Sequence, residues 1–326
     1  MIPLSVLDLS PINLGGNAAQ SFRNTLDLAR HAERYGFRRF WLAEHHGMPG
    51  IASAATAVLI GYVASGTSAI RVGAGGIMLP NHSPLVIAEQ FGTLESLYPG
   101  RIDLGLGRAP GSDSLTSQAL RRNLTSDPDE FPRDVLELAD YFSDSAGQAV
   151  RAIPGSGLNV PLWILGSSLF GAQVAAALGL PYAFASHFAP AQMMEAIAVY
   201  RSEFRPSRQL RQPYLMLGFN VFAADTLAEA QFRATSMQQA FVNLRSGRPS
   251  QLPPPVEGYL ERIGPPERAI LDQVLACTCV GTPEKVRSDL RNFAARTGAD
   301  ELIITCQIFD HGARLRSFEI AAQSQV

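Results

Sequence analysis

The chain alternates short apolar segments with segments of helical character, and it does so eight times. Uninterrupted apolar runs are typical of strands buried on both faces, and strands separated by helices pair in parallel. Eight such units predict a parallel (β/α)8 barrel that forms a single domain over residues 1–326. The predicted strands are "PLSVLDL", "RRFWLAE", "IRVGAGGIML", "RIDLGLG", "PLWILG", "YAFAS", "YLMLGFNVFA" and "ELIITCQ".

The alternative architecture for such a pattern is a doubly wound sheet. That fold would use fewer strands over this length and carry a glycine-rich phosphate fingerprint at its first turn, and none follows Leu9. A Pro- and Gly-rich insert at about 245–267 interrupts the pattern before the last strand. We expect this insert to lie on the surface with few core contacts and with its ends near the catalytic mouth, where it could act as a lid.

Charge and cysteine content exclude several classes of protein. The formal net charge is −2, so the chain as a whole has no electrostatic reason to bind nucleic acid or an acidic membrane. The uncharged run at 47–70 is rich in small residues, which indicates a buried helix and not a membrane span. Three cysteines give no disulfide framework, and Cys277 and Cys279 lack the second pair of a zinc site. We therefore expect a cytoplasmic protein.

Two histidines stand side by side directly after the second predicted strand, where Glu44, His45 and His46 end the segment "RFWLAEHH". The carboxyl ends of the strands form the active site of such barrels, and neighbouring residues of an extended chain point to opposite sides. At most one histidine should therefore face the mouth. Polar residues satisfied at a strand end, a proton-transfer histidine and a metal site are all open interpretations. Further metal ligands would be available from other loops: His82, His187 and His311.

Two further segments follow adjacent predicted strands and suit an anion. In "GLGRAPGSD" the third glycine is misplaced for a dinucleotide loop and Pro110 intrudes, but Arg108 would project from a glycine-rich rim. In "LGSSLFG" a strand meets its helix, and Ser167 and Ser168 either cap that helix or bind an anion there. Because the two segments follow adjacent strands and so meet at the same end of the barrel, they could bind one shared phosphate.

A pair of glycines interrupts the third predicted strand. Gly75 and Gly76 lie within "VGAGGIML", where glycine weakens a strand. Either a β-bulge or a flat ring pressed against the backbone would explain them.

Four of these motifs occur together in one order: "WLAEHH", "VGAGGIMLPNHSP", "GRIDLGLGR" and "LGSS…GLP". In this order and spacing the chain resembles the bacterial luciferase-like family of flavin-dependent monooxygenases, over nearly its whole length. The resemblance implies a (β/α)8 barrel that binds FMN, with the reduced flavin reacting with oxygen.

Carried over position by position, the resemblance assigns the site residues. It implies that His45 is the catalytic histidine, that Gly75–Gly76 is a non-proline cis peptide beneath the flavin ring, that Arg108 binds the phosphate, and that Ser167, Ser168 and Gly171 form the phosphate loop. Two positions depart from the luciferases themselves: Gly107 replaces a cysteine near the flavin, and Ser167 replaces an acid. We therefore do not expect light emission.

Together these observations predict a monooxygenase that uses reduced FMN to transfer one oxygen atom from O2 to a small apolar organic substrate. The resemblance implies a flavin reductase using NADH or NADPH as the supplier of FMNH2. We also expect a homodimer, no bound metal, and no nucleic-acid or membrane partner. Two alternatives are a hydride-transfer oxidoreductase that uses the deazaflavin F420, and a flavin-binding protein without catalysis.

Overall fold

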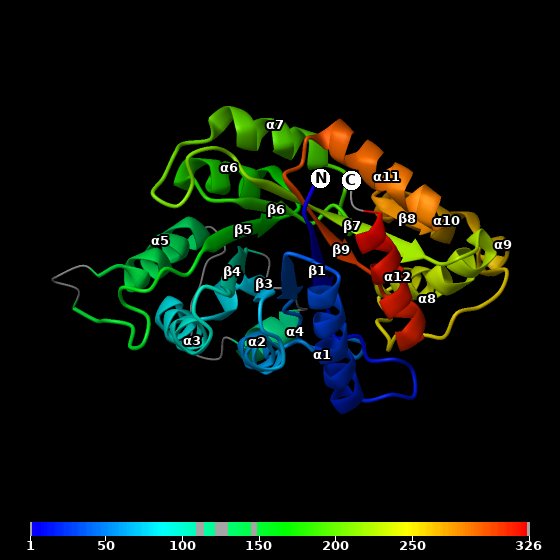
Figure 1. Ribbon diagram of the computed structural model, residues 1–326, viewed down its shortest axis with the longest axis horizontal. Helices are drawn as coiled ribbons and strands as arrows, with labels where there is room; N and C mark the ends of the chain where they lie inside the picture. Colours follow the sequence, from blue (N-terminus) through cyan, green and yellow to red (C-terminus); the bar gives the residue numbers. More distant parts are fainter. Residues whose placement is uncertain (1, 109–113, 121–129, 145–148, 325–326) are drawn as a thin grey trace.

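Eight parallel strands close into a barrel in the computed structural model, which describes residues 2–108, 114–120, 130–144 and 149–324 (Figure 1). Neighbours around the barrel follow the chain order, and closure comes from the pairings β6–β7, β7–β9 and β9–β1. All eight predicted strands are present, so the barrel prediction is confirmed. The barrel strands are β1 Leu4–Asp8, β2 Arg39–Leu42, β3 Arg71–Met78, β4 Ile102–Gly107, β5 Leu162–Gly166, β6 Tyr182–Phe184, β7 Leu215–Ala223 and β9 Glu301–Thr305.

Helices cover the outside of the barrel (Figure 1). Several begin at a residue whose side chain accepts a backbone N–H of the first turn, as Asn17, Thr226 and Asp310 do at the starts of α1, α8 and α12. The helices are α1 Ala18–Arg34, α2 Thr56–Ser65, α3 Pro84–Leu97, α4 Ser114–Leu120, α5 Phe131–Phe142, α6 Leu169–Leu178, α7 Met193–Glu203, α8 Leu227–Arg245, α9 Tyr259–Arg262, α10 Pro265–Val274, α11 Pro283–Thr297, α12 His311–Gln323 and the 3-10 helix η1 Leu79–Asn81.

The helix expected within the uncharged run at 47–70 is α2, which begins at Thr56 and ends at Ser65. Nowhere in the described chain does a helix combine the length and apolar character that crossing a membrane requires.

A ninth strand lies outside the barrel, and the sequence pattern did not reveal it. This strand, β8 Thr278–Gly281, pairs in parallel with the end of β7 at Asn220–Ala223. It is too short to show an apolar period, and it follows α10, beyond the end of the predicted insert at about residue 267. The region expected to be irregular also contains α9 and the start of α10, and Figure 1 shows these elements beside α8, away from the barrel axis.

The Pro-rich part of the insert is more firmly attached than the sequence suggested. Most of its residues are exposed, but Leu252 is buried. The Leu252 backbone donates to the carbonyl of Ile12 and accepts from the N–H of Leu14, at 2.9 and 2.8 Å. A Cβ at Gly50 would lie 2.4 Å from the carbonyl oxygen of Ser250, so the loop after β2 also fits closely against the insert. Leu252 therefore anchors the insert to the segment after β1.

Side chains fill the barrel interior. A buried apolar cluster there contains two indoles, Trp41 and Trp163, whose ring centroids lie 5.1 Å apart in an edge-to-face arrangement. Glycines on the neighbouring strands make room for it, because a Cβ at Gly73 would lie 2.9 Å from the Trp41 Nε1 atom. The other members of the cluster are Leu7, Ala43, Ala183, Met216 and Ile303. The barrel is thus a packed core, and a ligand must bind at one of its ends.

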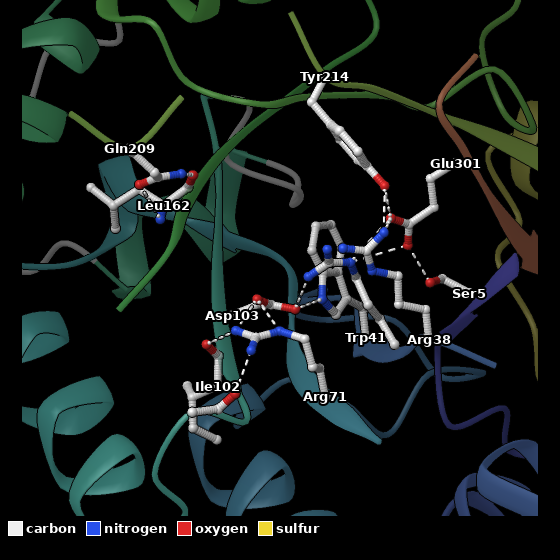
Figure 2. Close-up of polar contacts among 12 residues, drawn as sticks. Ser5, Arg38, Trp41, Arg71, Ile102, Asp103, Leu162, Gln209, Tyr214 and Glu301 are labelled. Carbon is white, nitrogen blue, oxygen red and sulfur yellow. Dashed lines mark hydrogen bonds and ion pairs between the residues drawn. The ribbon is translucent and has the colours of Figure 1, made fainter. Parts of the chain in front are cut away.

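The amino-terminal end of the barrel is closed by a network of buried charges (Figure 2). Arg39 contacts Asp103 at 2.7 Å and Glu301 at 3.1 Å, and Arg71 forms a second ion pair with Asp103 at 2.6 Å. The hydroxyl of Tyr214 donates to Glu301 at 2.8 Å. Burial alone would lower the pKa of Arg39, but the two carboxylates outweigh it and raise that pKa. These charges and the Tyr214 hydroxyl connect the starts of β2, β3, β4, β7 and β9.

Candidate active site at the carboxyl end of the barrel

A buried carboxylate connects the end of β2 to the loop after β3. Glu44 is 1% exposed, and its Oε1 atom accepts from the Nε2 atoms of His46 and His82 at 2.7 and 2.8 Å. Its Oε2 atom accepts the backbone N–H of Met78 at 3.1 Å. Burial would raise the pKa of Glu44, but the contacts with His82 and His46 and the Met78 N–H outweigh it and lower the pKa. The carboxylate therefore stays ionised and fixes both imidazoles.

The same three side chains are the set most suited to a metal ion among the described residues, because their ligand atoms lie within 4.8 Å of one another. Zinc ligands at about 2.0–2.1 Å from a tetrahedral ion would lie roughly 3.3 Å apart. The observed separations of 2.7 and 2.8 Å are hydrogen-bond lengths. His311, the remote candidate ligand, instead contacts Asp27 at 2.9 Å. The geometry is that of a hydrogen-bonded clamp, which we call the Glu44 clamp.

If the extended alternation of β2 continues past Leu42, His45 lies on the opposite side of the chain from His46. It shares its alternation with Trp41 and Ala43, which both belong to the cluster inside the barrel. It lies close enough to His187, after β6, that its charge helps to lower the pKa of that residue. His46 thus lies in the Glu44 clamp, and the position of His45 at the mouth stays a prediction.

The ends of β4 and β5 meet at the start of α6. The Arg108 guanidinium lies over the Phe170 ring, with Cζ 4.2 Å from the centroid, which places a cation at the first turn of this helix. Ser168 occupies the N-cap position with extended backbone, yet its side chain makes no capping hydrogen bond. Simple capping therefore does not account for Ser168, which stands at a helix start, where the first N–H groups have no partner within the helix.

Two glycines shape the turn between β5 and α6. A Cβ at Gly166 would lie 3.4 Å from the Gly171 Cα atom and 3.3 Å from the Tyr182 hydroxyl. That hydroxyl donates to the carbonyl of Ser168 at 3.1 Å, so β6 holds the turn in place. Ser167 is exposed on the same turn. The predicted members of the phosphate loop, Ser167, Ser168 and Gly171, are thus together, next to Arg108.

The glycine pair of β3 carries a cis peptide bond and lies at a bulge. The peptide bond between Gly75 and Gly76 is cis, as the resemblance implied. The register with β4 shifts between Ala74 and Ile77, so the strand also bulges here. A Cβ at Gly76 would lie 2.8 Å from the Gly105 carbonyl oxygen, which leaves no space for a side chain. Contact with a flat ring remains a prediction.

The sequence singled out Glu44 and His187 without giving either a role of its own. Their positions directly after β2 and β6 were the available signal, since the carboxyl ends of parallel strands meet at one rim. Their actual partners depend on loops far apart in the sequence, such as the contact of Glu44 with His82.

Comparison with known proteins agrees with these motifs. A family model described as luciferase-like monooxygenase matches residues 2–301. The chain belongs to this family. A relative from Escherichia coli (strain K12), itself named luciferase-like monooxygenase, is 56% identical over 321 residues, which are 98% of this chain and 96% of the relative.

More distant members of the luciferase-like family match over the same length. The N-acetyl-S-alkylcysteine monooxygenase of Bacillus subtilis (strain 168) is 32% identical over 333 residues, covering 99% of this chain and 98% of that protein. The crystal structure of apo-MsnO8 superimposes with a TM-score of 0.92 at 36% identity, covering 99% and 98% of the two chains. The chain is therefore an enzyme of the luciferase-like monooxygenase family, with the barrel fold that its strands predicted.

Proposed function

We propose that this enzyme is a reduced-FMN-dependent monooxygenase that transfers one oxygen atom from O2 to a small, apolar organic substrate. The observation that carries the proposal is the position of Arg108 over Phe170 at the N-terminus of α6. A guanidinium, helix N–H groups and serine hydroxyls are the donors that a phosphate dianion prefers. The close approach at Gly166 and Gly171 lets the backbone reach the anion. These residues fit the phosphate of FMN.

The remaining mouth residues suit a flat ring held above the barrel core. The backbone at Gly75–Gly76 offers a surface without side chains, and Leu7 and Trp41 lie directly beneath it. When bound, reduced FMN supplies the electrons that activate O2. The apolar interior beneath the ring keeps water away from that side. His45 holds or delivers a proton at an imidazole nitrogen, and the Glu44 clamp fixes the chain on either side of it.

The same proposal includes the substrate and partners. The name of the Bacillus subtilis relative, an N-acetyl-S-alkylcysteine monooxygenase, supports a small organic substrate. A flavin reductase using NADH or NADPH supplies the reduced flavin. Large apolar side chains lie exposed on the adjacent helices α2 and α3, which supports a homodimer. These side chains are Val58, Tyr62, Val86 and Leu97.

The phosphate role is tested by comparing FMN with riboflavin, which lacks the phosphate. Arg108→Ala should weaken FMN binding about tenfold or more and leave riboflavin binding nearly unchanged, since a charge-assisted contact is worth about 1.5–3 kcal/mol. Arg296→Ala is a matched control, because Arg296 also lies over a phenylalanine ring but on α11. Equal losses for both ligands would contradict the phosphate role.

Two separate experiments test the cofactor and the reaction. Binding of FMN and of F420 is measured side by side, and turnover is followed with NADH, a flavin reductase, FMN and a panel of small organic compounds. We expect oxygen transfer with FMN. Turnover only with F420 would instead indicate a hydride-transfer oxidoreductase, and flavin binding without turnover on any compound would favour a non-catalytic role.

A further inference from the structure

The backbone around His187 is held in place from β7. The Ser186 hydroxyl donates to the carbonyl of Gly218 at 2.7 Å, and the Asn220 side-chain amide donates to the carbonyl of His187 at 2.8 Å. The Phe188 N–H closes a turn onto the Ala185 carbonyl at 3.1 Å. His187 therefore stands on a fixed rim of the mouth, within reach of the charge of His45.

The orientation of the His187 ring follows from its contact with Gly218. A Cβ built on Gly218 would lie 2.1 Å from Nδ1 and 3.0 and 3.1 Å from Cγ and Cε1. Those two atoms flank Nδ1 in the ring, so Nε2 and Cδ2 form the opposite edge and point away from β7. Residue 218 can only be glycine if the ring is to keep this position.

The two nitrogens of His187 have different surroundings. Nδ1 is buried and has no hydrogen-bond partner in the described part of the chain. A buried N–H without an acceptor costs about 1–3 kcal/mol, so the proton belongs on Nε2. Burial first, and then the charge of His45, lowers the pKa of His187 to about 4, so the ring is neutral near pH 7. His187 thus presents a neutral Nε2–H on the edge that faces away from β7.

We propose that His187 is a further flavin-binding residue, whose Nε2–H donates a hydrogen bond to a carbonyl oxygen of the flavin ring at the mouth. The geometry supplies a fixed donor at the carboxyl end of the barrel, and the flavin ring carries carbonyl oxygens that accept such a bond. This inference rests on the proposed function, because it requires flavin to bind at this end of the barrel. It concerns the ring alone and not the phosphate.

The first test measures FMN and riboflavin binding to the full-length protein. His187→Phe keeps a ring but removes the donor, and it should weaken both ligands by the same factor, about three- to tenfold. Gly218→Ala should do likewise, because its Cβ displaces the His187 ring. Gly61→Ala is the matched control, since its Cβ would meet only the Leu94 side chain at 3.4 Å.

The second test observes the ring in the wild-type protein and so does not depend on the folding of a variant. With 15N-labelled histidine, NMR should show His187 as the neutral Nε2–H tautomer, and FMN should shift its Nε2 signal. His311, paired with Asp27 on the outside of the barrel, should not shift.

The outcomes separate the two proposals. Wild type that binds FMN with an unmoved His187 signal, or with unchanged affinity in His187→Phe, would overturn the role of His187 and leave the proposed function standing. Wild type that binds neither FMN nor riboflavin would overturn the proposed function itself.

Discussion

The two ends of the barrel are built from the same strands but use their side chains differently. At the amino-terminal end Arg39, Asp103 and Glu301 are buried and bonded to one another. At the carboxyl end His187 follows β6, with its Nδ1 edge packed against Gly218 and its Nε2 edge facing away from β7. Charged groups that bond to one another resist change, whereas a polar edge that points away from the neighbouring strand can bond to a ligand.

The contrast can be followed within single strands. Every second residue of β2 and its continuation belongs to the face that points into the barrel. Along this face lie Arg39 in an ion pair, then Trp41 and Ala43 in the core, and then His45 toward the mouth. Substitution at the first of these positions should affect folding, and substitution at the last should affect catalysis. The following predictions test that division.

His45→Ala should have the largest effect, a loss of turnover of about 10²–10⁴-fold with flavin binding retained, because proton transfer at the mouth is removed. Turnover is measured in the reductase-coupled assay and binding by flavin fluorescence. His46→Ala should lose less, because His46 donates to Glu44 and not to the mouth. Equal losses in the two variants would contradict the assignment, and inactivation of wild type by a chelator would favour a metal at the Glu44 clamp.

Asp103→Ala should destabilise the protein by roughly 3–5 kcal/mol, because it leaves two arginines at the amino-terminal end without their shared carboxylate. The free energy of unfolding in urea is the measurement. Asp144→Ala, which removes an exposed partner of Arg151, should change it by no more than about 1 kcal/mol. A similar small change for Asp103→Ala would mean that the amino-terminal network is not what stabilises the barrel.

Glu44→Gln should lower the free energy of unfolding by about 1.5–3 kcal/mol near pH 7, because it removes an ionised acceptor of two imidazoles. The folded-state pKa of Glu44 is lowered from 4.5, so its contribution is present above about pH 4.5 and is lost as the pH falls through the folded pKa. The difference from wild type in urea unfolding should therefore shrink from pH 7 to pH 4. A constant difference would show that the Glu44 carboxylate does not carry the effect.

Leu252→Ala should destabilise the protein by about 2 kcal/mol, because a buried leucine is lost from a segment that is otherwise mostly exposed. If the insert acts as a lid, the variant should release more hydrogen peroxide for each NADH consumed while FMN affinity is retained. Limited proteolysis between Gly247 and Gly258 reports the loosening. Faster cleavage with an unchanged peroxide ratio would show that the segment is only a surface excursion.

The sequence predicted the barrel well because its strands are short, apolar and separated by helices with recognisable ends. The same reasoning missed β8, whose four residues show no clear period, and underestimated the insert, where the burial of Leu252 depends on bonds to Ile12 and Leu14. Such contacts join residues more than two hundred positions apart and leave no local signal.

For the site, the sequence by itself determined which residues reach the catalytic rim, because a residue that follows a parallel strand must emerge at its carboxyl end. His45, Arg108, Ser167 and Ser168 were found in this way. Only the tertiary structure decided which partners they contact. The contact of Arg108 with Phe170, the Glu44 clamp with His82, and the place of the His187 ring over Gly218 each require two separate elements to meet. The local sequence determines where a residue lies along its strand, but the packing of elements across the barrel determines which side chains it contacts.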